Sequence, residues 1–292
     1  MLISKSISRL LVGAALIGTG ALVLPSPATA QSGSTCAAVD SSKLSPAAIA
    51  MRANLAAVPA REWLAVDNEI FFAVERRAFE LGGFDDMCAL AQSGNPRAQH
   101  LIGRAYSFGQ FGAAQDFVVA AEWHRRASAA GEARSQISLG LAYDRGDGVR
   151  RDDREAARLY EAAANGGFAW GQFNLGVFHE DGRAVPQDYR RAMALYRQAA
   201  AQNHPSALAN IGYLYNYGRG VAQDFVQAER WARRAAEAGS ETGQRLLGIL
   251  LYEGRQGVRQ NQADGVYWLR RAAAQNDEFA RDYLAERNLL PE

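Results

Sequence analysis

The sequence predicts an all-α fold in which antiparallel helix pairs stack into a solenoid. One glycine recurs along the chain, first after 37 residues and then three times after 36, and each copy has similar small, aliphatic and aromatic neighbours. A unit of this length cannot bury its own apolar face, so successive units must stack to form a continuous core. The glycine stands at Gly103, Gly140, Gly176, Gly212 and Gly248.

Residues 1–30 have the pattern of a secretory signal peptide. Lys5 and Arg9 precede an apolar run over 10–24, and Ala28-Thr29-Ala30 fits a small-x-small cleavage site. A membrane span needs about 20 apolar residues, so an uncleaved anchor is the weaker interpretation. We expect a periplasmic or secreted chain that has no stable membrane insertion once the signal is removed.

The charge balance argues against a nucleic-acid partner. The chain has 32 basic and 31 acidic residues, a formal net charge of +1. Such a chain has no long-range attraction for a phosphate backbone. We therefore expect no nucleic acid among its partners, whereas stacked helical arrays usually bind other proteins.

The two cysteines, Cys36 and Cys88, predict one disulfide. An even number of cysteines in an exported chain favours pairing. On the chain-entropy model, closing this loop stabilises the fold by about 4 kcal/mol. Metal binding by two lone cysteines without an adjacent histidine is the weaker alternative, so we expect a single tether at one end of the chain.

A flexible leader and a helical cap precede the repeats. Residues 31–45 are small and polar, which is typical of a leader. Residues 46–96 form the cap, in which Ser45-Pro46 predicts a helix start and Gly82-Gly83 a helix stop. The end of the cap, Ala89 to Gly94, matches the end of each later repeat, so we interpret it as the second half of a degenerate repeat.

Each repeat predicts a helical hairpin, helix A followed by helix B. The recurring glycine lies inside helix A, where it costs about 1 kcal/mol relative to alanine, so we expect a close helix approach there. A second glycine ends helix A as a left-handed cap, and an Asp or Asn then begins helix B as its N-cap. These cap pairs are Gly109 and Asp116, Gly146 and Asp152, Gly182 and Asp188, Gly218 and Asp224, and Gly254 and Asn261.

Helix B carries a small residue at its inner crossing and a large apolar residue three positions later. We expect these large residues to lie in the core, Trp231 included. They are Trp123, Leu159, Leu195, Trp231 and Trp268. Residues 278–292 then form a final capping helix, whose charged side chains suit an end on which no neighbour stacks.

The repeats resemble the Sel1-like repeat, a relative of the tetratricopeptide repeat. The fourth copy shows the pattern most clearly, with Ala207, Ile211-Gly212, Tyr215, Gly218-Arg219-Gly220-Val221 and Asp224. The copies extend over about 97–132, 133–168, 169–204, 205–240 and 241–277. The resemblance implies a right-handed α-solenoid whose helices A line a concave groove, and a non-catalytic adaptor that holds a protein or peptide there. Periplasmic relatives are often regulators of sensor proteins or assembly factors for envelope complexes.

Positions on helix A that the packing face leaves free predict the binding residues. These positions lie six and three residues before the recurring glycine, and one, four and five residues after it. Aromatic and arginine side chains at such positions are typical of binding anchors. The predicted groove residues are Arg104, Trp170, Phe173, Tyr213, Tyr217, Arg245 and Tyr252.

The sequence predicts no catalytic residue, metal site or cofactor, and therefore no enzyme. Its histidines form no pair at metal-ligand spacing on one helix, and no nucleophile elbow or phosphate loop occurs. Two other classes stay open as alternatives. Some cysteine-rich relatives have been linked to β-lactam hydrolysis, so one alternative is a cell-wall or β-lactam hydrolase. Aromatic grooves also stack on sugars, so the other is a peptidoglycan- or carbohydrate-binding protein.

Overall fold

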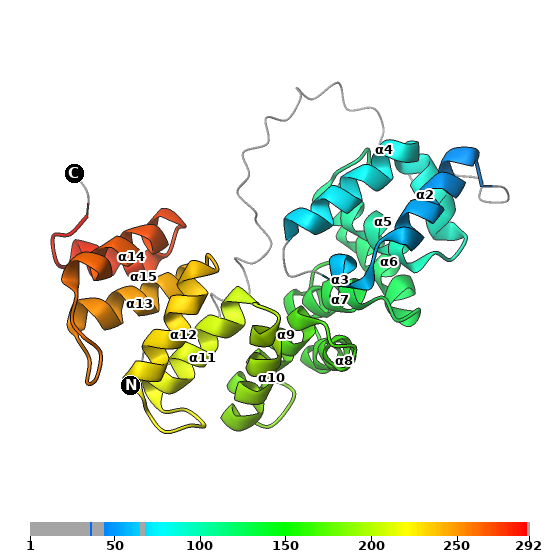
Figure 1. Ribbon diagram of the computed structural model, residues 1–292. Coiled ribbons are helices and arrows are strands. Elements are labelled where there is room, and N and C mark those ends of the chain that lie inside the picture. Colours follow the sequence, from blue (N-terminus) through cyan, green and yellow to red (C-terminus); the bar gives the residue numbers. More distant parts are fainter. Residues whose placement is uncertain (1–35, 37–43, 65–67, 291–292) are drawn as a thin grey trace. The chain divides into compact units, whose positions relative to one another are not determined.

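The computed structural model describes Cys36, residues 44–64 and residues 68–290, and the regular structure within them is helical throughout (Figure 1). The predicted all-α fold is confirmed. The predicted signal peptide, residues 1–30, lies outside the described residues, as does most of the predicted leader. In the part of the chain that the structure describes, no helix has the length and apolar character needed to cross a membrane.

The chain divides into two units, Met1–Phe168 and Ala169–Glu292. The first holds the N-terminal cap, with α2 (Pro46–Ala57), α3 (Ala60–Trp63) and α4 (Asn68–Gln92), and two repeats, with α5 (Pro96–Phe108), α6 (Phe117–Ala129), α7 (Ala133–Arg145) and α8 (Asp153–Asn165). The second holds three repeats, with α9 (Ala169–Asp181), α10 (Tyr189–Ala201), α11 (Pro205–Tyr217), α12 (Phe225–Glu237), α13 (Glu241–Glu253) and α14 (Gln262–Ala274), and then α15 (Glu278–Ala285). Odd-numbered helices from α5 to α13 are the helices A, and even-numbered helices from α6 to α14 are the helices B.

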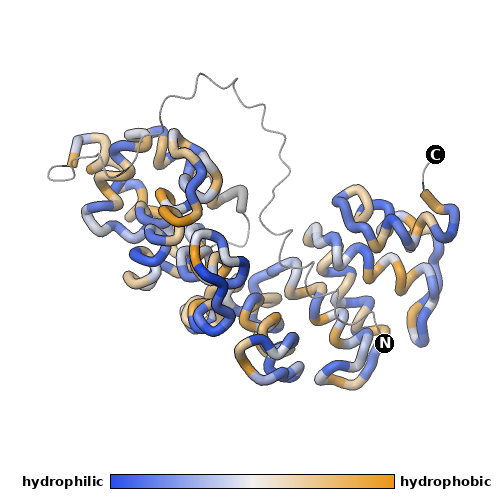
Figure 2. The backbone as a smooth tube through the Cα atoms, turned by 180° about the vertical axis from the view of Figure 1, so that it is seen from behind, coloured by the Kyte–Doolittle hydropathy of each residue, from blue (hydrophilic) through white to orange (hydrophobic). Residues whose placement is uncertain are grey.

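The repeat helices pack in chain order within each unit. In the first unit α5 contacts α6, α6 contacts α7 and α7 contacts α8, and in the second unit the helices from α9 to α15 contact one another in the same consecutive way. In the second unit α11 also contacts α13, so two consecutive helices A meet. Hydrophilic and hydrophobic stretches alternate within the helices (Figure 2), because each helix turns one face to its neighbours and another to solvent. This stacking of consecutive helix pairs is that of an α-solenoid.

The predicted caps delimit the repeat helices. The glycine that follows helix A adopts the left-handed conformation, as at Gly146 where φ is 85°, and a residue without a Cβ does so at no steric cost. Helix B begins at the expected N-cap. Asp152 accepts hydrogen bonds from the backbone nitrogens of Arg154 at 2.9 Å and Glu155 at 3.2 Å. The other N-caps of helices B are Asp116, Asp188, Asp224 and Asn261.

The recurring glycine lets an aromatic ring of helix B lie directly against helix A. A Cβ added at Gly140 would stand 2.6 Å from the Tyr160 ring, and one added at Gly176 would stand 2.6 Å from the Tyr196 ring. Contacts this short are not possible, so only glycine fits at these crossings. Both tyrosines are almost fully buried. The predicted close approach is therefore confirmed, and the ring of helix B is its cause.

Other side chains fill the same space in the outer repeats. In the first repeat the ring is His124, whose nearest atom would lie 2.6 Å from a Cβ added at Gly103. In the fourth repeat Ala232 stands at the ring position, and Leu246 of α13 comes within 3.0 Å of a Cβ added at Gly212. This position of helix B, four residues after its small crossing residue, is a core position that we did not single out from the sequence.

The expectation that Trp231 lies in the core is wrong, because its side chain is only half-buried. Trp268 in the next repeat is half-buried as well, whereas the equivalent residues of the first three repeats are buried. The inner side of α12 is made of alanines, among them Ala228 and Ala232, which are fully buried. The indole of Trp231 reaches past this contact to solvent, where the Arg234 guanidinium lies 4.6 Å from its ring centroid.

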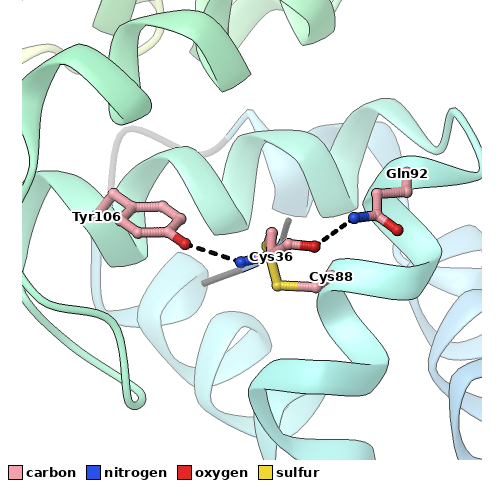
Figure 3. Close-up of a disulfide and its surroundings, with 4 residues drawn as sticks. All are labelled: Cys36, Cys88, Gln92 and Tyr106. Carbon is pink, nitrogen blue, oxygen red and sulfur yellow. Dashed lines mark hydrogen bonds between the residues drawn. A yellow bond between two sulfur atoms is a disulfide. The ribbon is translucent and has the colours of Figure 1, made fainter. Parts of the chain in front are cut away.

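A disulfide between Cys36 and Cys88 ties the leader to α4 (Figure 3). The two Cα atoms are 5.2 Å apart, and both residues are buried. The backbone of Cys36 is held on both sides, because its nitrogen donates to the Tyr106 hydroxyl at 3.1 Å and its carbonyl oxygen accepts from the Gln92 amide. The structure thus contains the predicted pairing, set within the core of the first unit.

The helix boundaries in the cap differ in one place from the prediction. Ser45 caps α2 as expected, and its hydroxyl accepts from the backbone nitrogen of Ala48 at 3.0 Å. The predicted stop at Gly82-Gly83 is a kink instead. Gly83 has φ of 73° and ψ of −167°, and helical structure continues on both sides of it from Asn68 to Gln92.

Replacing Gly140 by alanine should destabilise the first unit by about 1–3 kcal/mol, because the new methyl group overlaps the Tyr160 ring. Gly166→Ala is the matched control in the same repeat, since its φ is −73° and its nearest neighbours are 3.4 Å or more from an added Cβ. Urea unfolding curves of both variants test this. Equal midpoints would show that the crossing tolerates a side chain.

Purified chain should contain no free thiol, because both cysteines are joined. Quantitative labelling of unfolded, unreduced protein checks this, and two reactive thiols per chain would contradict the disulfide. Replacing both Cys36 and Cys88 by alanine should lower the free energy of unfolding by about 4 kcal/mol. Unfolding curves of the double variant measure that loss.

Candidate partner-binding surface

Arg104, the first predicted groove residue, binds the chain's own N-terminal cap. Its guanidinium donates to the two carboxylate oxygens of Glu75 on α4, at 2.8 Å and 3.3 Å. It also lies over Phe71 and Phe72, 5.1 Å and 5.3 Å from their ring centroids. The expectation that Arg104 faces an open groove is therefore wrong. The reason is the part of α4 before its kink at Gly83, which carries Glu75 and both rings and does not belong to a repeat.

Residues of α3 and its flanks cover the neighbouring positions of helices A in the same unit. The Trp63 indole donates to Glu132 at 2.8 Å, and Arg134 donates to the carbonyl oxygen of Trp63. Arg97 donates to the carbonyl oxygen of Val58 at 2.9 Å and lies 4.8 Å from the centroid of the Trp63 ring. In the first unit, these helices A therefore already hold a short piece of polypeptide, mainly by its backbone carbonyl groups.

Two buried histidines lie beneath this contact. The Nδ1 atoms of His100 and His124 are 2.9 Å and 3.3 Å from the Ser135 hydroxyl. Burial lowers the pKa of His124 to about 3, with a smaller effect from the Arg104 charge. Burial also holds the pKa of His100 well below its usual value. Both rings are thus neutral at pH 7. Among the described residues, no group of three or more His, Cys, Asp or Glu could hold a metal ion.

Phe173, the third predicted groove residue, is 2% exposed, so it is not free to contact a partner. Its ring stacks on His204 at 4.7 Å, and the half-buried Trp170 meets the same ring edge-on at 4.4 Å. His204 is the N-cap residue of α11. The position three residues before the recurring glycine therefore faces the next helix A, and the sequence prediction assigned it to the wrong side.

The same contact recurs in other repeats with different chemistry. His100 lies 3.5 Å from Glu132, the N-cap of α7. Arg245 lies 2.5 Å from Asp277, the N-cap of α15. Each of these N-cap residues thus has two tasks, because it caps its own helix and also contacts the preceding helix A.

Arg245 is the centre of an aromatic surface in the second unit. Its Nε donates to the Tyr213 hydroxyl at 3.0 Å, and it lies 5.1 Å from the centroid of Phe279. Tyr213 stacks in turn on Tyr217 at 6.0 Å. We call Tyr213, Tyr217, Arg245, Asp277 and Phe279 the Arg245 surface. The structure thus brings three of the seven predicted groove residues together, with two that were not predicted.

The Arg245 surface combines one positive charge with two exposed aromatic rings. Burial opposes the charge of Arg245, yet Tyr213 and Asp277 raise its pKa above the usual value, so it stays a cation. Tyr217 is 49% exposed and Phe279 is 42% exposed. Large aromatic rings with this exposure, around a fixed guanidinium, are the side chains that most often anchor a protein partner.

Phe279 could have been found from the sequence. It stands two residues after the N-cap of α15, the register that Trp170 holds in the third repeat, so α15 begins as a further helix A. The remaining predicted residue, Tyr252, is half-buried and meets Tyr283 edge-on at 5.9 Å. Tyr252 lies on the same helix as Arg245, but its ring contact is with Tyr283, which is not part of the Arg245 surface.

The five helix pairs and their cap residues can be compared with known families. The Sel1 repeat profile matches residues 96–132, 133–168, 171–204, 205–240 and 242–277, more than half of the chain. This chain belongs to the Sel1 repeat family. Proteins built from Sel1 repeats generally act as scaffolds for protein interactions.

Solved structures with Sel1 repeats have the same fold. The chain is similar to a Sel1 repeat protein from Oxalobacter formigenes, at 28% identity and a TM-score of 0.64, over 76% of this chain and 86% of that one. It is also similar to a protective antigen of uropathogenic Escherichia coli strains that displays an SLR fold, at 29% identity and a TM-score of 0.64. That match covers 81% of this chain and 50% of the antigen, so this chain spans half of its length. No curated protein matches the chain.

His124, one of the two buried histidines of the first Sel1 repeat, should make the fold sensitive to acid. The pKa of His124 is about 3 in the folded chain and 6.5 in the unfolded one, so between these values only the unfolded chain binds the proton. The contribution of His124 to the free energy of unfolding is therefore complete above pH 6.5 and is lost as the pH falls toward 3, by roughly 1.4 kcal/mol per pH unit. His124→Phe should flatten the dependence by that amount. Urea unfolding between pH 7 and 4 measures it, and equal slopes would contradict it.

Proposed function

We propose that this Sel1 repeat chain is an exported, non-catalytic scaffold that binds a segment of a protein partner at the Arg245 surface. The observation that carries the proposal is a pair of exposed rings near Arg245: Phe279 lies against its guanidinium, and Tyr217 stacks on the Tyr213 ring that Arg245 binds. Isolated exposed aromatics need no explanation, but rings gathered around a fixed cation are a common core of protein interfaces.

The first unit supplies a precedent for this mode of binding. There the equivalent positions of helices A hold Trp63 and its flanking backbone, through Arg97, Glu132 and Arg134. The chain itself thus shows that helices A of Sel1 repeats can hold a short polypeptide that carries an aromatic side chain. At the Arg245 surface no segment among the described residues covers Tyr217 or Phe279 in this way, so a partner would supply it.

Export rests on two features. Residues 1–30 have the signal-peptide pattern described above, and the buried disulfide between Cys36 and Cys88 suits an oxidising compartment. A scaffold in the periplasm or outside the cell would meet envelope proteins, so a regulator or assembly factor of an envelope complex is the role we favour.

Replacing both Tyr217 and Phe279 by alanine should weaken partner binding by about thirtyfold or more, because truncating one interface anchor commonly costs 2 kcal/mol. Folding should change little, since both side chains lie at the surface and not in the core. The measurement is recovery of bound protein from an envelope extract by immobilised chain, followed by titration of the protein recovered. Phe117→Ala is the matched control, because Phe117 is 43% exposed and lies on α6, a helix B.

The same experiment separates this proposal from the two alternatives. Digesting the cell wall before capture should leave binding intact, whereas loss of binding after digestion would indicate a peptidoglycan ligand. Purified chain should not turn over a chromogenic β-lactam. Turnover that survives further purification would make the chain a hydrolase and overturn the scaffold proposal, as would equal binding by the double variant and the wild type.

A further inference from the structure

Three helices B carry the same pairing of a tryptophan with an arginine three residues later. In α6 the Arg126 guanidinium lies 4.7 Å from the centroid of Trp123. In α12 Arg234 lies 4.6 Å from Trp231, and in α14 Arg271 lies 5.4 Å from Trp268. The packing role of helix B does not require these arginines, which are exposed in all three helices.

The first of these pairs is completed by a carboxylate. Glu122 precedes the tryptophan by one residue, and its Oε1 lies 3.2 Å from Nε of Arg126, one helical turn away. The equivalent residue in the other two helices is not an acid. It is Arg230 in α12 and Tyr267 in α14. The Tyr267 hydroxyl accepts from Arg271 at 3.3 Å but carries no charge to balance it.

A carboxylate recurs as the third member of this arrangement among the described residues. Six arginines that lie over an aromatic ring have a carboxylate oxygen at 2.5 to 3.8 Å. They are Arg104 with Glu75, Arg126 with Glu122, Arg219 with Glu180, Arg245 with Asp277, Arg255 with Glu253 and Arg287 with Glu286. Among the described residues, Arg234 and Arg271 form no such ion pair. Glu229, an acid of α12, pairs instead with Arg233 at 2.7 Å.

The two tryptophan–arginine pairs without a carboxylate, in α12 and α14, lie in neighbouring repeats of one unit. Trp268 of α14 packs against a core cluster to which α12 contributes Ala228 and Ala232, so both helices adjoin the same cluster. Arginine outnumbers acid on both helices. In α12 and α14 together there are five arginines and three acidic residues. The local charge is therefore positive, although the whole chain is near neutral.

We infer that Trp231 with Arg234 and Trp268 with Arg271 bind the carboxylate groups of an acidic segment in a protein partner. A guanidinium held over an indole presents a fixed planar fork, which matches a carboxylate in two parallel hydrogen bonds. This surface belongs to helices B, so it is separate from the Arg245 surface and does not depend on the function proposed for it.

An acidic protein segment fits better than an anionic membrane. Within the chain, the six arginines of this kind that form an ion pair are paired with carboxylates. A membrane-binding helix also needs apolar side chains that enter the lipid, and Tyr267 is the one large apolar side chain that α12 and α14 leave mostly exposed among the described residues. Lipid phosphate groups could pair with the two arginines, but these helices have too few exposed apolar side chains to enter the lipid.

The test follows the indole N–H signals of Trp231, Trp268 and Trp123 by NMR while a ten-residue polyglutamate peptide is added to the full chain. We expect the first two signals to shift together and that of Trp123 to stay in place, because Glu122 already occupies its arginine. Replacing both Arg234 and Arg271 by alanine should weaken the peptide affinity by about tenfold or more. Arg126→Ala, the matched control, should leave it unchanged.

A second variant gives both arginines an intramolecular carboxylate partner, as Arg126 has in the first repeat. Changing Arg230 and Tyr267 to glutamate places an acid one turn before each arginine, as Glu122 is placed before Arg126. This variant should fold and should lose the shifts of both indole signals. Shifts that persist in it, or a response of Trp123 equal to the others, would overturn the inference. So would shifts that occur with phosphatidylglycerol vesicles and not with polyglutamate, since the ligand would then be a membrane.

Discussion

The approach of helix A to helix B at the recurring glycine is the contact on which the remaining structure depends. A ring such as Tyr160 or Tyr196 lies where a Cβ would otherwise be, so the two helices of a repeat have one allowed spacing. Their outer side chains, and the N-cap residue that contacts the preceding helix A, then fall at fixed places. In the fourth repeat, Leu246 of the following repeat fills part of this space and the backbone of α12 comes within 3.3 Å of a Cβ added at Gly212, so the glycine is needed there as well.

The sequence predicted what is decided within one repeat. The Gly146 cap and the Asp152 N-cap follow from backbone geometry and a local hydrogen bond, and the period fixed the order of the helices. It did not predict contacts between repeats. Phe173 was assigned to the surface because the period gives the register of a side chain but not the stagger of neighbouring repeats, and that stagger places His204 over its ring. Burial of Trp231 was predicted because the period gives it the register of the buried residues in the first three repeats. The period does not show that alanines form the inner side of α12.

Contacts from outside the period were also beyond sequence reasoning. Arg104 has the composition and register of a binding residue, and it does bind an aromatic and acidic partner, but the partner is α4 of the same chain. Neither Glu75 nor Trp63 belongs to a repeat, so no spacing rule connects them to helices A. The chemistry of the position was therefore predictable, whereas the identity of its occupant was not.

The N-cap residues of helices A also contact the preceding repeat, and this affects how the array of repeats unfolds. Asp277 caps α15 and holds Arg245 of α13, and His204 caps α11 and holds Phe173 of α9. When such a helix frays, the preceding repeat loses a contact in the same event, so neighbouring repeats have coupled equilibria. Each unit should accordingly unfold cooperatively. Deleting a whole repeat together with its helix A N-cap residue should destabilise the unit less than replacing the N-cap residue alone.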